Sequence, residues 1–207
     1  MNQWRASFRC LTFVGTTFLL AACASEKAQI SPEVTSGLTQ VRAQAVQIKQ
    51  QLSRTTDSAR TLSKSSASEL PVALDAVSAN LDSLDSTLGV TRQTVRSVQE
   101  QVATYFFNWD KQTRAMSDEM QKASQKRQAE AAASFESLRS SIGDVRAGLS
   151  QYMSDMSEIV AYLRTDQTPA GVHAVSSRLS ETIAGEPPIQ RNLDAVISKI
   201  DAIQSAK

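Results

Sequence analysis

The chain has 207 residues, with 22 Lys and Arg against 21 Asp and Glu, and only 5% of its residues are aromatic. Such a near-neutral charge gives no electrostatic reason to expect nucleic acid as a partner. Seven Gly and five Pro are too few for the turns of an all-β domain, so the composition predicts an all-α protein.

Residues 1–22 have the features of an export signal and are set apart from the fold. Arg5 and Arg9 precede an uncharged, mostly apolar run over residues 10–20. This run is too short to cross a bilayer, which takes about 20 apolar residues. It has the length of the apolar segment of a signal peptide.

The apolar run ends on Leu-Ala-Ala-Cys at residues 20–23, which resembles the bacterial lipobox. The resemblance implies that Cys23 receives a diacylglycerol and becomes the first residue of a lipidated tether over residues 23–31. Ala24, in place of Asp, implies delivery to the outer membrane of a Gram-negative cell, on its periplasmic face. The alternatives are an ordinary secretory signal with a chance cysteine and an apolar N-terminal helix.

The two cysteines leave no thiol for other chemistry if this interpretation holds. Cys10 is removed with the signal, and the sulfur of Cys23 carries the lipid. The fold of residues 32–205 is therefore expected to contain neither a disulfide nor a cysteine metal site.

Residues 32–205 are expected to form one elongated antiparallel bundle of about four long helices with coiled-coil-like heptad packing. In the first helix Ser31 is a candidate N-cap and Pro32 lies in the first turn. Its apolar residues, with one Thr among them, alternate in steps of three and four. They are Val34, Leu38, Val41, Ala45, Ile48, Leu52, Thr55, Ala59 and Leu62. Residues 64–70 interrupt the pattern.

The second helix is expected from Pro71 to a boundary near residues 115–118, where Ser117 is a candidate N-cap. The third is expected over about 118–164; its first half is poor in apolar residues, and the heptad spacing returns from Phe135 onward. Residues 165–171 predict a turn, in which Thr168 is a candidate N-cap for the next helix. The fourth helix, from Pro169, should be kinked or briefly broken at residues 185–188, where two prolines stand in its interior.

Charge supports an antiparallel pairing of the first two helices, because the end of the first is basic and the start of the second is acidic. The residues concerned are Lys49, Arg54, Arg60 and Lys64 in the first helix, and Glu69, Asp75, Asp82 and Asp85 at the start of the second. Four antiparallel helices should return the C-terminal end of the bundle to the place where the first helix begins.

The sequence contains no pattern typical of a catalytic, metal or cofactor site. His173 is the single histidine, so no imidazole pair can bind a metal, and no Gly-rich phosphate loop or nucleophile motif is present. The acidic residues are spaced as on solvated helix faces. We therefore expect a protein that is not an enzyme.

Tyr105, Phe106, Phe107 and Trp109 form the most conspicuous cluster of side chains. Five consecutive helical positions span more than one turn, so these aromatic rings cannot all face one core. The cluster is either a helix end that is buried on several sides or an exposed patch for a partner or the membrane interface.

The second half of the chain carries a family resemblance at scattered helix positions. These are Phe106, Trp109, Met116, Ser117, Arg127, Leu138, Met156, Tyr162 and Leu163. Together they resemble an uncharacterised group of bacterial lipoproteins, domain-of-unknown-function family 2959, from which the chain departs in residues 185–188 and in its weaker charge. The resemblance implies a helical envelope lipoprotein and transfers no site residue.

Two functions fit these features. The first is a lipid-anchored structural or interaction module, bound to the membrane through its N-terminal lipid and to an envelope protein. The alternative is a small binding module that carries an apolar ligand between its helices. The alternative predicts a cavity lined by the apolar heptad positions, whereas a tightly packed bundle predicts none.

Overall fold

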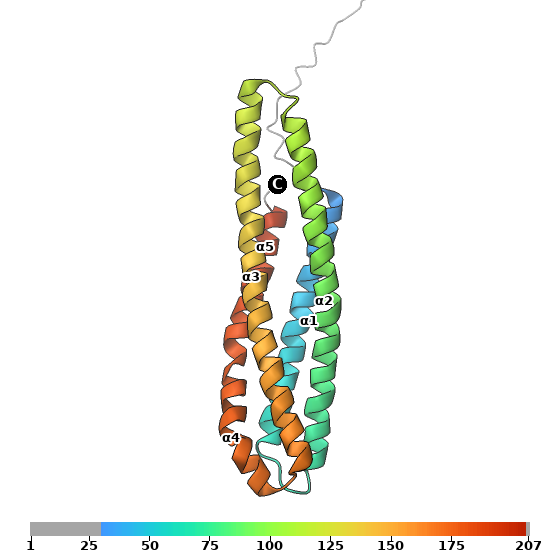
Figure 1. The fold of residues 1–207 in the computed structure, drawn as a ribbon, viewed down its shortest axis with the longest axis vertical. Helices are drawn as coiled ribbons and strands as arrows, with labels where there is room; N and C mark the ends of the chain where they lie inside the picture. The colour runs from blue at the N-terminus through green and yellow to red at the C-terminus, as the bar shows by residue number, and fades with distance from the viewer. Residues whose placement is uncertain (1–29, 206–207) are drawn as a thin grey trace, which may run out of the picture.

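The computed structural model describes residues 30–205, so the signal segment, Cys23 and nearly all of the tether lie outside the described residues. The described part is an elongated helical bundle (Figure 1), which confirms the all-α prediction. Its helices are α1 (Pro32–Leu62), α2 (Leu70–Thr113), α3 (Asp118–Thr165), α4 (Pro169–Ala184) and α5 (Glu186–Ser205). Helices α4 and α5 together take the place of the expected fourth helix.

Neighbouring helices run antiparallel, as expected. At one end of the bundle α5 returns to the start of α1, where Arg42 Nε donates to Asp201 Oδ1 at 2.6 Å and Gln204 Nε2 donates to Thr39 Oγ1 at 2.9 Å. The loops that follow α1 and α3 both lie at the opposite end (Figure 1). The described C-terminal residues therefore return to the end at which the chain enters the bundle.

Most helix ends follow from local side-chain chemistry. Ser31 Oγ accepts from the Val34 N–H at 3.3 Å, and Thr168 Oγ1 accepts from the Gly171 N–H at 3.1 Å, so both expected caps form. Ser117 does precede α3 but makes no capping hydrogen bond with its side chain. The helix boundary and the N-cap position of Ser117 are therefore confirmed, without a side-chain capping bond.

The break between α4 and α5 is a single residue, Gly185. Pro187 and Pro188 lack the N–H groups that would bond to the carbonyls of residues 183 and 184, which lie four residues earlier. The carbonyls of residues 181 and 182 are still used, because the Gly185 N–H donates to both. The chain is therefore interrupted without leaving this edge of the bundle (Figure 1).

The predicted apolar pattern of the first helix describes the core accurately. Each of its nine positions is at most 4% exposed, and Thr55 is buried among them. The pattern also holds in the lower halves of α2 and α3, where Leu84 and Leu149 are buried. In the upper halves Val95 and Phe135 are only half-buried, so the heptad pattern marks the correct face but not a closed core there.

Polar side chains pair α1 with α2 beside this core. Gln44 Nε2 donates to Thr94 Oγ1 at 3.0 Å, and Gln51 Nε2 donates to Ser83 Oγ at 3.1 Å. As the residue number rises along α1, the number of its partner in α2 falls. These hydrogen bonds support the antiparallel register that the charges predicted.

The charges themselves do not pair across this interface. Within residues 30–205, no ion pair joins the basic residues at the end of α1 to the acidic residues at the start of α2. Lys49 pairs instead with Asp194, and Arg60 Nη2 with Glu186 Oε2 at 3.3 Å, both in α5. The antiparallel pairing that the charges predicted is confirmed, but the charges themselves do not make it, and α5 supplies the partners of Lys49 and Arg60.

Gly37 lies at a close approach of α1 to α2. A Cβ atom at this position would lie 2.5 Å from Val98 Cγ2, whereas a Cβ at Gly89 would have no neighbour within 4 Å. Gly37→Ala should therefore lower the free energy of unfolding by about 1–2 kcal/mol, since overpacking outweighs the gain in helix propensity. Gly89→Ala should raise it by about 0.5–1 kcal/mol. Urea unfolding measures both, and two shifts of the same sign would contradict the close approach.

Candidate functional site

The connection between α2 and α3 projects beyond the rest of the bundle (Figure 1). Gly37 of α1 lies against Val98 and Gln101 of α2, so the start of α1 is level with about residue 105. Residues 106–113 of α2 therefore extend about 12 Å further, at 1.5 Å per residue. We call residues 106–128, the end of this α2–α3 hairpin, the hairpin tip.

Buried hydrogen bonds hold the two helices of the hairpin tip together. Trp109 Nε1 donates to Ser124 Oγ at 2.8 Å, and the hydroxyl groups of Thr113 and Ser124 lie 2.7 Å apart. Further down, Gln128 Nε2 donates to the carbonyl of Phe106 at 3.4 Å. The hairpin tip is thus a packed unit, although no third helix among residues 30–205 lies beside it.

The structure divides the aromatic cluster instead of bringing its four rings onto one surface. Trp109 is buried and stacks on Phe106, with ring centroids 6.1 Å apart, while Tyr105 meets both rings edge-on. Burial raises the pKa of the Tyr105 hydroxyl. Phe107 points away from these rings and is 70% exposed. Trp109 therefore fits the buried interpretation and Phe107 the exposed one, while Tyr105 and Phe106 are half-buried between them.

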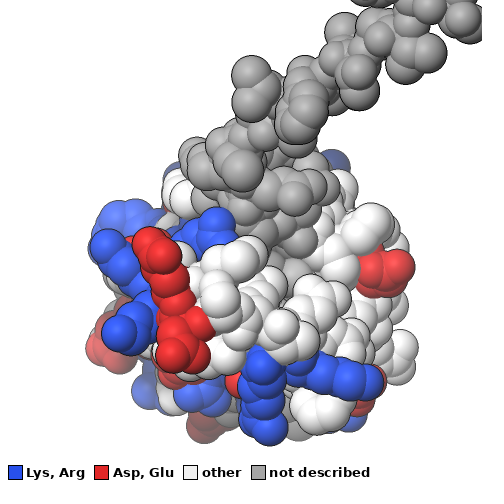
Figure 2. Space-filling view, turned by 90° about the horizontal axis from the view of Figure 1, so that it is seen from above, with Lys and Arg blue, Asp and Glu red and all other residues white. Residues whose placement is uncertain are grey.

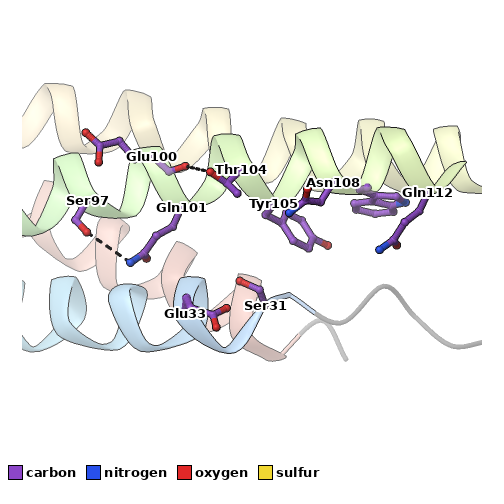
Figure 3. Close-up of a pocket in the computed structure, with 10 residues that line it drawn as sticks. Ser31, Glu33, Ser97, Glu100, Gln101, Thr104, Tyr105, Asn108 and Gln112 are labelled. Atoms are coloured by element: carbon purple, nitrogen blue, oxygen red, sulfur yellow. Dashed lines mark hydrogen bonds between the residues drawn. The ribbon is translucent and has the colours of Figure 1, made fainter. Parts of the chain in front are cut away.

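A polar pocket of about 710 Å³ lies beside the start of α1 (Figure 3). The side chains of Gln101, Tyr105 and Gln112 extend from α2 toward the side on which α1 lies, whereas the Glu100 carboxylate points away from α1 (Figure 3). The lining residues are Ser31, Glu33, Ser97, Glu100, Gln101, Thr104, Tyr105, Asn108, Trp109 and Gln112. The lining supplies hydroxyl, amide and carboxyl groups beside the rings of Tyr105 and Trp109, with no basic residue among them.

A second pocket, of about 430 Å³, opens between the upper halves of α2 and α3, with α1 at its base. Apolar side chains make up most of its lining, and only three polar residues contribute. The lining residues are Leu38, Val41, Val95, Val98, Gln99, Val102, Ala103, Phe106, Ala132, Phe135, Glu136, Leu138, Arg139 and Ile142. We call this pocket the apolar groove.

Short side chains account for the apolar groove. Ala103 of α2 and Ala132 of α3 line the groove, each next to a heptad position of its helix, and both are exposed. At the rim Arg139 donates through Nε and Nη2 to both carboxylate oxygens of Glu136, at 2.8 and 2.7 Å. This pairing lowers the pKa of Glu136, so the rim carries a neutralised ion pair beside an apolar floor.

A buried polar cluster next to the α4–α5 break was not anticipated from the sequence. Glu186 is 8% exposed, and its Oε1 accepts from Ser53 Oγ at 3.2 Å and from Gln190 Nε2 at 3.0 Å. The Tyr152 and Thr56 hydroxyls lie 2.8 Å apart, and burial raises the pKa of Tyr152 to about 12. Tyr152 therefore stays protonated at neutral pH, and the cluster joins α1, α3 and α5 rather than supplying a base.

Within residues 30–205, no group of three or more His, Cys, Asp or Glu side chains could hold a metal ion. His173 is exposed on α4. None of the helices in this part of the chain is long and apolar enough to cross a membrane.

The fold and the hairpin tip together define the class of protein: an all-α antiparallel bundle with a projecting helical hairpin. Comparison with protein-family models, curated proteins and solved structures finds no match. Membership in domain-of-unknown-function family 2959 therefore stays a prediction.

Proposed function

We propose that the chain is a lipid-anchored outer-membrane protein whose helical bundle serves as a structural or interaction module on the periplasmic face. The observation that carries the proposal is the order of Arg5 and Arg9, the apolar run and the Leu-Ala-Ala-Cys segment that ends on Cys23. Ala24 favours the outer membrane as the destination. Without a recognisable catalytic or metal pattern, binding fits better than catalysis.

The architecture fits an anchor at the N-terminal end. The chain enters α1 at Ser31, beside the end of α5, and the loops that follow α1 and α3 lie at the other end of the bundle. Helix α1 has 31 residues and is therefore about 46 Å long. A bundle held by Cys23 would present those two loops to an envelope partner at about this distance from the first turn of α1.

Metabolic labelling with a palmitate analogue, followed by flotation of outer-membrane vesicles, tests the proposal. The wild-type protein should carry the label, float with the vesicles and begin at Cys23 by intact mass. A mature protein that retains residues 1–22, or that lacks the acyl mass, would rule out the anchor.

A second candidate function is favoured by the apolar groove: a module that binds an apolar ligand between its helices. The volume of about 430 Å³ lies within the range of small-molecule sites. Val95, Val102 and Phe135 remain half-buried in its lining, so a ligand could remove their apolar surface from water.

Filling the apolar groove tests this candidate. Ala132→Phe should weaken binding of a fluorescent fatty acid at least about tenfold, equivalent to about 1.4 kcal/mol, because the new ring occupies the ligand volume. Ala133→Phe is the matched control, since Ala133 is also exposed but does not line the groove. Titration by fluorescence measures both variants. No saturable binding to the wild type, or equal affinities for the two variants, would exclude the candidate.

A further inference from the structure

We propose that the hairpin tip rests on the lipid surface to which Cys23 anchors the chain, with Phe107 and Met120 entering the interfacial region. The inference rests on the proposed anchor and adds a second, non-covalent contact with the same membrane. Three properties of the hairpin tip favour this contact: its position, the chemistry of its surface and its rigidity.

The position follows from the length of the tether. Eight residue steps separate Cys23 from Ser31 and span at most about 28 Å when extended. The hairpin tip extends about 12 Å beyond the start of α1, on the end where the chain enters the bundle (Figure 1). The lipid on Cys23 and the hairpin tip can therefore reach one surface at the same time.

The outer surface of the hairpin tip combines apolar and basic side chains. Phe107 is 70% and Met120 is 57% exposed, on α2 and α3 respectively. Lys111 lies one turn beyond Phe107, and Lys122 lies two residues beyond Met120; both are exposed. Such long cationic side chains can keep the charge in water while apolar neighbours enter an interface.

The end view of the molecule agrees with this arrangement. Seen from above, uncharged side chains occupy the middle of the end, and Lys and Arg side chains lie on two sides of it (Figure 2). Asp118 and Glu119 in the first turn of α3 offset part of the basic charge. Residues 106–128 contain five Lys and Arg against three Asp and Glu. This small net charge leaves apolar insertion as the main contribution, so the contact should depend only weakly on salt concentration.

The internal packing fixes which residues face outward. Trp109 is held by Ser124, and Phe106 meets Phe135 edge-on with ring centroids 5.8 Å apart. These contacts leave Phe107 on the opposite side of α2. Two apolar side chains bind a bilayer only weakly by themselves, but a lipid anchor on the same chain keeps them at high effective concentration.

Site-specific labels in the mature lipidated protein test the contact. Phe107→Cys and Met120→Cys each introduce a single free thiol, because the sulfur of Cys23 carries the lipid. An environment-sensitive fluorophore at either position should be quenched several-fold more strongly by brominated phospholipids than one at Val72→Cys, in vesicles of phosphatidylethanolamine and phosphatidylglycerol. Val72 is the matched control, since it is 73% exposed near the opposite end of α2.

Flotation of the same vesicles separates this inference from the proposed anchor. Protein that fails to float overturns both. Protein that floats with equal quenching at residues 107, 120 and 72 overturns the lipid contact alone. Shielding of the Phe107→Cys label that requires added envelope proteins would identify a protein-docking surface and would also overturn the contact. Strong quenching at both hairpin positions, at low and high salt alike, supports it.

Discussion

Cys23→Ser should abolish membrane attachment almost completely. Serine has no thiol to receive a diacylglycerol, so the mature protein would have neither of the acyl groups that this attachment supplies. Firm anchoring needs two chains or more, because one acyl chain binds a membrane only marginally. The variant should therefore lose palmitate labelling and either remain unprocessed or be released into the periplasmic fraction.

Labelling and fractionation of the variant beside the wild type measure this effect. Ala24→Ser is a suitable control, since it changes the neighbouring residue and leaves the cysteine in place. The lipobox interpretation would be untenable if the Cys23→Ser variant stayed both labelled and membrane-bound.

Leu149→Asp should destabilise the bundle by about 3–5 kcal/mol, because it places an unpaired carboxyl group in the apolar core. Leu149 is 2% exposed, and the neighbouring Gly148 approaches Ile189 of α5 closely. For a chain of this length, such a loss lowers the Tm by about 6–20 °C.

Ser150→Asp is the matched control, since Ser150 is the next residue of α3 and is exposed to solvent. It should change the Tm by no more than about 2 °C, because most surface substitutions fall within 0.5 kcal/mol. Thermal unfolding followed by circular dichroism compares the two variants. Similar melting temperatures would show that the heptad pattern of α3 does not describe its buried face.

Local chemistry was sufficient to predict the helices and most of their ends. Ser31 and Thr168 cap helices through atoms only three residues away, and two adjacent prolines are enough to interrupt the last helix. Periodicity likewise identified the buried face of α1, because a helix places residues three and four apart on one side. These features depend on sequence neighbours, so a single chain contains the information they need.

Only the tertiary structure decided how far each face is covered. The same heptad spacing runs through Leu84 and Val95, yet the first is buried and the second borders the apolar groove. The sequence gives the direction in which a side chain points, but not whether a neighbouring helix closes the space opposite it. Small residues such as Ala132 leave that space open.

The partners of the ion pairs and the exposure of the aromatic rings also depended on the tertiary structure. Lys49 and Arg60 pair with residues of α5 rather than α2. An ion pair forms with the carboxylate that helix packing places within reach, and sequence alone does not give that position. Phe107 and Trp109 are two residues apart, and only the position of α3 decides that one is exposed and the other buried. Sequence spacing determined that the aromatic cluster had to divide between faces, and the three-dimensional arrangement determined which ring each face received.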